Sequence, residues 1–374
     1  MSAYSKKAVA AIEPLVLEKV NILVRRFRQA HDENAVLVLD AAFAALTADI
    51  ISEYSFGSCL NYLEDESFNN EIRESLMASL SLFHVVRFFP AIMMLAKVLP
   101  VPLVRLLNPN LCKVLDLRRL IRELTMRELG KMSSGLPSQA MLVKRLNDPS
   151  IPECERSLER LCDEGFVFLN AGVTAGKTLA FIMFRLLSHG GVTYSKLFDE
   201  LERAFPDVGA LDHVTEKDLV ALPYLRGVVY EGLRLSIGPL TRLPRVAPDT
   251  ALLFQGQVIP PGTGISESNY FLHMNEELFP CPTQFRPERW AEANKNGKRL
   301  ENYIVTFSKG TRHCLGMNLA YMELYMLVAV LVRRFHMELY QTTDKDVEIF
   351  RDKLFGYPRE PSLGVRIRVS ACRS

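Results

Sequence analysis

Apolar residues recur at helical spacing along much of this 374-residue chain. In the segment 8–31 they form one stripe that predicts a core helix. The stripe consists of Leu15, Val16, Val20, Leu23, Val24 and Phe27. The same spacing predicts further helices over 39–54, 70–89, 101–132, 193–205, 222–235 and 317–333. The longest such pattern, 158–189, would cross most of a domain at about 1.5 Å per residue, so we expect it to be a central helix.

The pattern changes after residue 250. Short apolar runs at 250–259 and 265–270, separated by Pro260, Pro261 and Gly262, predict short strands and tight turns. Another strand is predicted at 363–369. A long irregular stretch, 279–303, precedes the last helix, and such loops usually have a function. The chain is therefore expected to be mainly α with a small β portion, and to form a single domain over residues 1–374 because no linker divides it.

Composition and charge narrow the class of protein. Hydrophobic residues make up 48% of the chain and charged residues 24%, which is typical of a globular protein. A formal net charge of +2 gives no case for nucleic-acid binding. The cysteines are odd in number and widely spaced, which suits a reducing compartment. The first residues carry no signal-peptide core or membrane span, and the apolar region 76–107 is interrupted by Arg, Lys and Pro. That region is expected to be buried helix and loop, or alternatively a membrane-surface or substrate-access segment.

A cysteine near the end of the chain has the surroundings of a metal ligand. Cys314 is flanked by Gly310 and Gly316, which permit tight turns, and an apolar helical run follows it. The free N–H groups of a helix start and the charge of Arg312 favour the thiolate, the form that binds metal. The alternative is a free cysteine that is simply buried.

Two charged residues lie on one face of an apolar helical segment. Glu231 and Arg234 are three residues apart and are surrounded by leucine and valine. Such a pair is usually exposed, but these flanks predict burial, and a buried charge needs partners. Arg289 in the segment 285–290 could supply the third partner.

The central helical segment contains two glycines, Gly172 and Gly176, on either side of Thr174. Each glycine costs on the order of 1 kcal/mol relative to alanine in a helix, so something should offset the cost. One explanation is a widened turn that leaves room for a cofactor and lets the Thr174 hydroxyl bind oxygen or a proton-delivering water. The other is close helix packing, with Thr174 bonded to the carbonyl four residues back.

The loop around Cys314 resembles the haem-binding loop of the cytochrome P450 family, F-x-x-G-x-R-x-C-x-G, and the central helix, the E-x-x-R pair and the Arg289 segment precede it in the family's order. The resemblance implies a cytochrome P450-like fold and haem b with Cys314 as its axial thiolate. It also implies that Arg245 and Arg312 bind the haem propionates and that Glu231, Arg234 and Arg289 form a structural triad. His273 resembles a recurrent position of fungal members and is interpreted as a structural histidine. The loop residues that carry the match are Phe307, Gly310, Arg312, Cys314 and Gly316.

The resemblance further implies a haem-thiolate monooxygenase of fungal secondary metabolism. Such an enzyme would insert one oxygen atom from O2 into a hydrophobic small molecule, by hydroxylation or epoxidation, for example in terpenoid biosynthesis. Its electrons would come from NADPH-cytochrome P450 reductase, attracted by basic residues; the alternative is that these residues form a solvated charged face. The resemblance places the protein at the endoplasmic reticulum membrane; without a transmembrane anchor, this chain is expected in the cytoplasm or in peripheral contact with the membrane. The basic residues are Lys298, Arg299, Lys309, Arg333 and Arg334.

The sequence departs from the family pattern in two places. The family's oxygen-activation motif, A/G-G-x-D/E-T, has no acid here, whether Thr174 is aligned with the motif's threonine or, without a gap, with its acid and Ala175 with its threonine. The start of the chain also resembles the family's third main helix, so that the membrane anchor, the first helices and part of the larger sheet have no counterpart. These departures leave two alternatives open: a non-catalytic, N-terminally truncated remnant of the family, and a haem-dependent isomerase or dehydratase.

Overall fold

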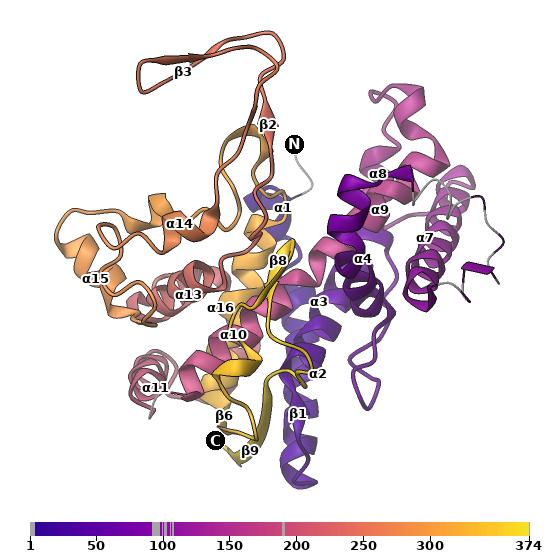
Figure 1. Ribbon diagram of the computed structural model, residues 1–374. Coiled ribbons are helices and arrows are strands. Elements are labelled where there is room, and N and C mark those ends of the chain that lie inside the picture. Colours follow the sequence, from indigo (N-terminus) through magenta and orange to yellow (C-terminus); the bar gives the residue numbers. More distant parts are fainter. Residues whose placement is uncertain are drawn as a thin grey trace.

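The computed structural model describes residues 4–91, 98, 100, 103–104, 106, 108–188 and 191–373. Helices hold 59% of the residues and strands 8%, which confirms the prediction of a mainly α chain with a small β portion. Figure 1 shows α10 and α16 running through the middle, with α2 and α3 to one side and α13 to the other. The helices are α1 Lys6–Ala10, α2 Glu13–Asp32, α3 Leu39–Phe56, α4 Glu71–Phe88, α7 Pro109–Ser133, α8 Met141–Leu146, α9 Leu158–Gly172, α10 Thr174–Ser188, α11 Val192–Ala204, α12 Glu216–Val220, α13 Pro223–Ser236, α14 Asn269–His273, α15 Glu288–Lys295 and α16 Met317–Arg334.

The strands are short, and in the described residues they pair antiparallel. One three-stranded sheet has the order β1-β9-β6, and the other three sheets are two-stranded. The strands are β1 Leu37–Val38, β2 Arg245–Val246, β3 Leu252–Phe254, β4 Gln257–Ile259, β5 Gly264–Ile265, β6 Phe335–Leu339, β7 Arg351–Lys353, β8 Phe355–Tyr357 and β9 Arg366–Cys372. The β3–β4 hairpin, predicted at 250–259, extends away from the helices in Figure 1. Its turn residues Gln255 and Gly256 have φ values of 49° and 79°, as a tight two-residue hairpin turn requires.

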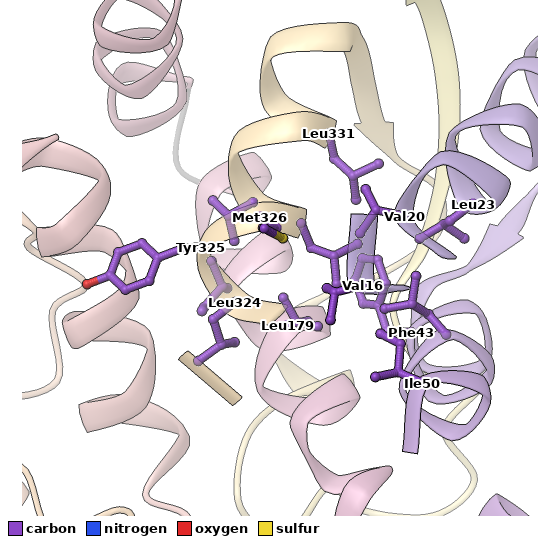
Figure 2. Close-up of a cluster of buried hydrophobic side chains, with 14 of the residues drawn as sticks. Val16, Val20, Leu23, Phe43, Ile50, Leu179, Leu324, Tyr325, Met326 and Leu331 are labelled. Atoms are coloured by element: carbon purple, nitrogen blue, oxygen red, sulfur yellow. The ribbon is translucent and has the colours of Figure 1, made fainter. Parts of the chain in front are cut away.

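The core lies where α2, α3, α10 and α16 meet. The stripe predicted for the first helix is its buried face, since Val16, Val20 and Leu23 have 0% exposed surface. Figure 2 shows these side chains packed together with those of α3, α10 and α16, including Leu179 and Leu331. Burying each such side chain contributes about 1.5–3 kcal/mol as an upper estimate, so this contact fixes α10 and α16 relative to each other.

Several predicted elements differ from the structure, and the stretch 279–303, predicted to be irregular, contains the helix α15. The helix predicted over 8–31 is divided into α1 and α2, because Pro14 lacks an N–H and is tolerated only in the first turn of α2. The helix predicted over 158–189 is interrupted at Val173 into α9 and α10; its predicted end at 189–190 lies outside the described residues. The strand predicted over 265–270 stops at Ile265, because its partner β2 has only two residues, and Asn269 begins α14.

Within the described residues, one stretch is long and apolar enough to cross a membrane. It is Leu158–Ser188, which is α9 and α10 together, and 44% of its most apolar window is buried in the protein. This stretch packs against α3, α13 and α16, as the core helix of a globular protein does. The predicted apolar segment 76–107 is described only in part; there, Phe88 and Phe89 are 69% and 64% exposed.

Candidate active site

The loop before α16 presents Cys314 by folding back on itself. The backbone N–H of Cys314 donates to the Phe307 carbonyl at 2.7 Å, which closes the loop. The loop turns at Ser308 and Gly310, whose φ values of 60° and 72° lie in the left-handed region. The Phe307 ring packs on Tyr321 of α16, with 5.3 Å between ring centroids. Glycine is therefore needed at position 310 for the turn.

The start of α16 contacts the cysteine sulfur. Gly316 is the N-cap residue of α16, and the N–H groups of Gly316 and Met317 hydrogen-bond the Cys314 sulfur. Partial burial of the sulfur raises the pKa of the thiol, and these two N–H groups oppose that rise without cancelling it. The helix start thus acts in the predicted direction, but a thiolate at Cys314 needs a further positive charge, such as a metal. The tight turn predicted at Gly316 is present, closed by the Met317 N–H and the Cys314 carbonyl at 3.5 Å, but the φ of −82° at Gly316 does not require glycine.

Cys314 and Thr174 line the same cavity, which has a volume of about 1990 Å³. The Cys314 loop forms one wall, and the junction of α9 and α10 forms another. The β7–β8 hairpin contributes Leu354 and Phe355. Gly310 shapes the loop without lining the cavity. The predicted site residues on its walls are Thr174, Arg245, Phe307, Arg312, Cys314 and Gly316.

The two glycines beside Thr174 serve close packing against α3. A Cβ on Gly172 would lie 2.8 Å from the Ile51 side chain, and one on Gly176 would lie 2.9 Å from the backbone of Phe43 and Ala44. The Thr174 hydroxyl donates to the Ala171 carbonyl at 2.7 Å, three residues back rather than four. The helix is interrupted at Val173, which agrees with the widened turn that the glycines predicted. The space beside the two glycines is filled by α3, which agrees with the predicted close packing.

The Glu231 carboxylate is the centre of a buried cluster of donors. Arg234 binds both of its oxygens, at 2.7 and 3.0 Å, and the Arg289 Nε donates to Oε1 at 3.0 Å. The Trp290 indole N–H donates to Oε2 at 3.1 Å, and the Arg286 backbone N–H donates to Oε1 at 3.0 Å. The side chains of Glu231 and Arg234 are 0% exposed. The structure therefore brings the three predicted triad residues together and buries them.

The two arginines of this cluster organise the irregular stretch before the cysteine loop. The Arg234 guanidinium donates to the carbonyls of His273 at 2.8 Å and Pro282 at 2.7 Å. Arg289 donates to the Pro280 carbonyl at 2.8 Å. These carbonyls have no strand ladder to bond with, so the guanidinium groups satisfy them. The Thr306 hydroxyl then donates to a carbonyl of α13 at 2.8 Å, which ties α13 to the residue preceding Phe307.

His273 is a buried hydrogen-bonding residue outside the cavity wall, as predicted. It has 0% exposed surface, and its Nε2 accepts the Val305 N–H at 3.1 Å. Its Nδ1 has no partner in the described part of the chain. Burial, together with the charge of Arg234, lowers the pKa of His273 to about 4.

This depressed pKa predicts a loss of stability in weak acid. Between pH 6.5 and 4, the unfolded chain binds a proton at His273 that the folded chain does not, so the free energy of unfolding falls as the pH falls. The expected loss is about 2 kcal/mol between pH 7 and pH 5. Urea titrations at both pH values should show the loss in the parent protein and in the exposed-site control His336→Gln. In His273→Gln the pH-dependent part should be smaller by that amount; an unchanged difference would contradict the assignment.

Sequence reasoning missed several charged residues on the cavity wall, two of them on α10 and α16. Glu323 of α16 is only 3% exposed, and burial raises the pKa of its carboxyl well above the ordinary value. Lys177 of α10 also lines the cavity. The available signal was a single charge within each apolar helical run, at Glu323 between Met322 and Leu324 and at Lys177 two residues before Leu179.

Two arginines on the cavity wall are free to bind carboxylates. Arg245 in β2 donates to the carbonyls of Leu243 and Pro244, at 3.4 and 3.1 Å. Arg312 lies in the short 3-10 turn Gly310–Arg312 and is exposed. Neither guanidinium has a carboxylate partner among the described residues. Paired N–H donors make such groups suited to anionic oxygens.

The basic residues proposed to attract a reductase divide into two groups. Lys298, Arg299 and Lys309 are exposed. Arg333 and Arg334 are 3% and 4% exposed, which contradicts the prediction for these two. Arg333 donates to the carbonyl preceding Pro206 at 3.1 Å, and Arg334 forms a 2.7 Å ion pair with Asp212. Both guanidinium groups therefore form contacts within the protein and are not available to a reductase.

Comparison with known proteins identifies the family. A family model described as Cytochrome P450 matches residues 1–362. Conidiogenone synthase PchP450 of Penicillium rubens is 43% identical, over 99% of this chain and 74% of its own length. The chain belongs to the cytochrome P450 family. Cytochrome P450 monooxygenase TRI4 of Trichoderma arundinaceum is 38% identical, over 96% of this cytochrome P450 and 69% of its own length.

A solved structure shows the same fold. The crystal structure of the cytochrome P450 CYP102L1 matches with a TM-score of 0.75 at 18% identity, and covers 99% of this chain and 76% of that chain. This confirms the predicted cytochrome P450-like fold. Relatives such as TRI4 are named monooxygenases, and the family membership makes this cytochrome P450 an oxidoreductase.

The family implies haem with a cysteine thiolate ligand, and the residues of this cytochrome P450 fit that cofactor. Among the described residues, no group of three or more His, Cys, Asp or Glu side chains could hold a metal ion. A metal at Cys314 must therefore take most of its ligands from a cofactor, such as the porphyrin of haem. The sulfur opens into a cavity large enough for a macrocycle, and Arg245 and Arg312 are present for two carboxylates.

Proposed function

We propose that this cytochrome P450 binds haem b through Cys314 and inserts one oxygen atom from O2 into a hydrophobic small molecule. The reaction would be hydroxylation or epoxidation in fungal secondary metabolism, such as terpenoid biosynthesis, with residues 1–374 acting as one domain. The observation that carries the proposal is the single cavity onto which both Cys314 and Thr174 open. The names of the fungal relatives support the substrate class.

In this proposal each site residue has a defined task. Haem, when bound, supplies the chemistry of oxygen activation. The N–H groups of Gly316 and Met317 hold the Cys314 sulfur, and the Phe307 ring packs against the loop from the side of α16. Arg245 and Arg312 bind the propionates. The cluster around Glu231 keeps α13 and the preceding irregular stretch at a fixed distance beneath the loop.

Thr174 is the candidate for handling protons at the cavity. Its hydroxyl proton is donated to the Ala171 carbonyl, so its oxygen is free to accept a hydrogen bond from water. The neighbouring residues Val173 and Ala175 cannot carry a proton. Protons would therefore reach the hydroxyl through water. The lack of a neighbouring acid also supports a second candidate, haem-dependent isomerisation or dehydration without net oxygenation, which does not need the usual acid-assisted proton delivery.

Electron supply and location follow from the family. The cytochrome P450 family uses a redox partner and is commonly associated with membranes. NADPH-cytochrome P450 reductase would dock at the exposed cations Lys298, Arg299 and Lys309, which lie before and within the cysteine loop. The protein would work at the endoplasmic reticulum surface, in peripheral contact with the membrane.

The spectrum of the reduced carbon-monoxide complex tests the proposal. The parent protein should show the Soret shift of a thiolate-ligated haem. Cys314→Ala should lose it, while Cys154→Ala, which removes an exposed cysteine elsewhere, should keep it. A parent protein without the thiolate spectrum would refute the haem-enzyme proposal. Incorporation of oxygen-18 from O2 into the product would then separate monooxygenation from rearrangement.

A further inference from the structure

Lys177 projects into the cavity from the same helix face as Thr174. The two residues are three positions apart on α10, and residues at that spacing are neighbours on a helix surface. Phe181, one turn further along, also lines the cavity. The amine thus stands beside the space where a hydrophobic substrate would lie.

The Lys177 ammonium has one described contact and unused donors. Its Nζ lies 3.9 Å from the centre of the Tyr357 ring in β8, a cation–π contact. In the described part of the chain, Nζ has no hydrogen-bond acceptor and no ion-pair partner, although a lysine ammonium carries three N–H donors. Burial lowers the pKa of Lys177 to about 8, against the charge of Asp40, so the amine is still protonated at neutral pH.

The charges around this position leave an excess of one cation. Asp40 and Arg73 both line the cavity and act electrostatically on the Tyr357 hydroxyl. One Asp40 oxygen already accepts the Val365 N–H at 2.7 Å. The Arg73 guanidinium has no acceptor among the described residues. Lys177 and Arg73 thus carry two positive charges and unused N–H donors, whereas Asp40 supplies one negative charge and already accepts one hydrogen bond.

We propose that Lys177, with Arg73, binds a carboxylate at one end of an otherwise hydrophobic substrate. An ammonium in a mostly apolar cavity gains most from a group that returns both hydrogen bonds and charge, and a carboxylate does so. The apolar walls around it suit the remainder of the molecule; they include Leu76, Met77, Phe83, Phe181 and Leu354. This assignment rests on the proposed function, because it describes the substrate of the same site.

A matched pair of probes tests this assignment on the haem-loaded protein. Decanoate and decan-1-ol have the same chain and differ in the head group, and calorimetry measures both affinities without electron supply. The parent protein should bind decanoate at least about 10-fold more tightly than the alcohol. Lys177→Met, which keeps the aliphatic stem, should weaken decanoate binding by about 10-fold and leave decan-1-ol binding unchanged. Lys177→Arg should keep the preference, and the exposed-site control Lys144→Met should behave as the parent.

The outcomes separate this assignment from the proposed function. Unchanged decan-1-ol binding in Lys177→Met shows that the variant is folded with its cavity intact. Equal affinities of the parent for the two probes, binding of neither probe, or full decanoate affinity in Lys177→Met would each overturn the carboxylate assignment while the thiolate spectrum still stood. Loss of the thiolate spectrum in the parent would overturn the proposed function instead.

Discussion

Replacing Glu231 by alanine is expected to abolish haem incorporation. The substitution removes the acceptor for Arg234, Arg289 and the Trp290 indole, and leaves two guanidinium groups buried without their counter-charge. Breaking a buried ion pair in this way costs about 3–5 kcal/mol, a large share of the 5–15 kcal/mol that typically stabilises a protein. The measurements are haem absorbance per unit of protein and the melting temperature of the purified variant.

An exposed ion pair nearby provides the control. Arg286 and Glu292 also form a 2.7 Å ion pair, but their side chains are 44% and 54% exposed. Glu292→Ala should therefore cost about 0–1 kcal/mol and keep full haem content. A Glu231→Ala protein with parental haem content and melting temperature would show that the buried cluster does not support the cysteine loop.

The apolar spacing along the sequence predicted those helices whose burial can be recognised within a single segment. Apolar runs located α3, α13 and α16 to within a few residues. In α13 one apolar face repeats at helical spacing, whereas α3 and α16 carry buried residues on nearly every side. The strands had weaker signals. β6 and β9 bring Phe335 opposite Cys372, and β1 contributes only Leu37 and Val38 to the same sheet. Such short segments acquire strand geometry from partners far away in the sequence, which no local period records.

The residues of the candidate active site also divide into those that the local sequence predicts and those that depend on distant contacts. Cys314 and its loop could be predicted because the turn residues, the sulfur and the helix start are consecutive. The burial of Arg334 depends on Asp212, and the position of Lys177 depends on Tyr357. Contacts of this kind arise from tertiary packing, so a charge in an apolar run could be recognised from the sequence while its partner could not.

Gly227→Ala is expected to destabilise the protein by about 3 kcal/mol, the upper end for overpacking. Gly227 lies in α13, where a Cβ would stand 2.5 Å from the Pro287 carbonyl oxygen. That oxygen belongs to the backbone and cannot rotate away as a side chain would. Either α13 or the segment before α15 must move, and both Arg286 and Arg289 would then move relative to Glu231. The variant should therefore lose haem together with stability.

Gly130→Ala is the matched substitution, since Gly130 also lies in a helix, α7. Apart from its chain neighbours and the nearby backbone of α7 itself, no described heavy atom lies within 4 Å of the position that a Cβ would occupy there. Alanine restricts the unfolded chain and suits a helix, so this variant should gain about 0.5–1 kcal/mol. Urea unfolding of the two variants measures the contrast. Two equal midpoints would mean that α13 and the Pro287 segment can separate without cost, and the support of the cysteine loop would then have to come from Thr306 and α16 alone.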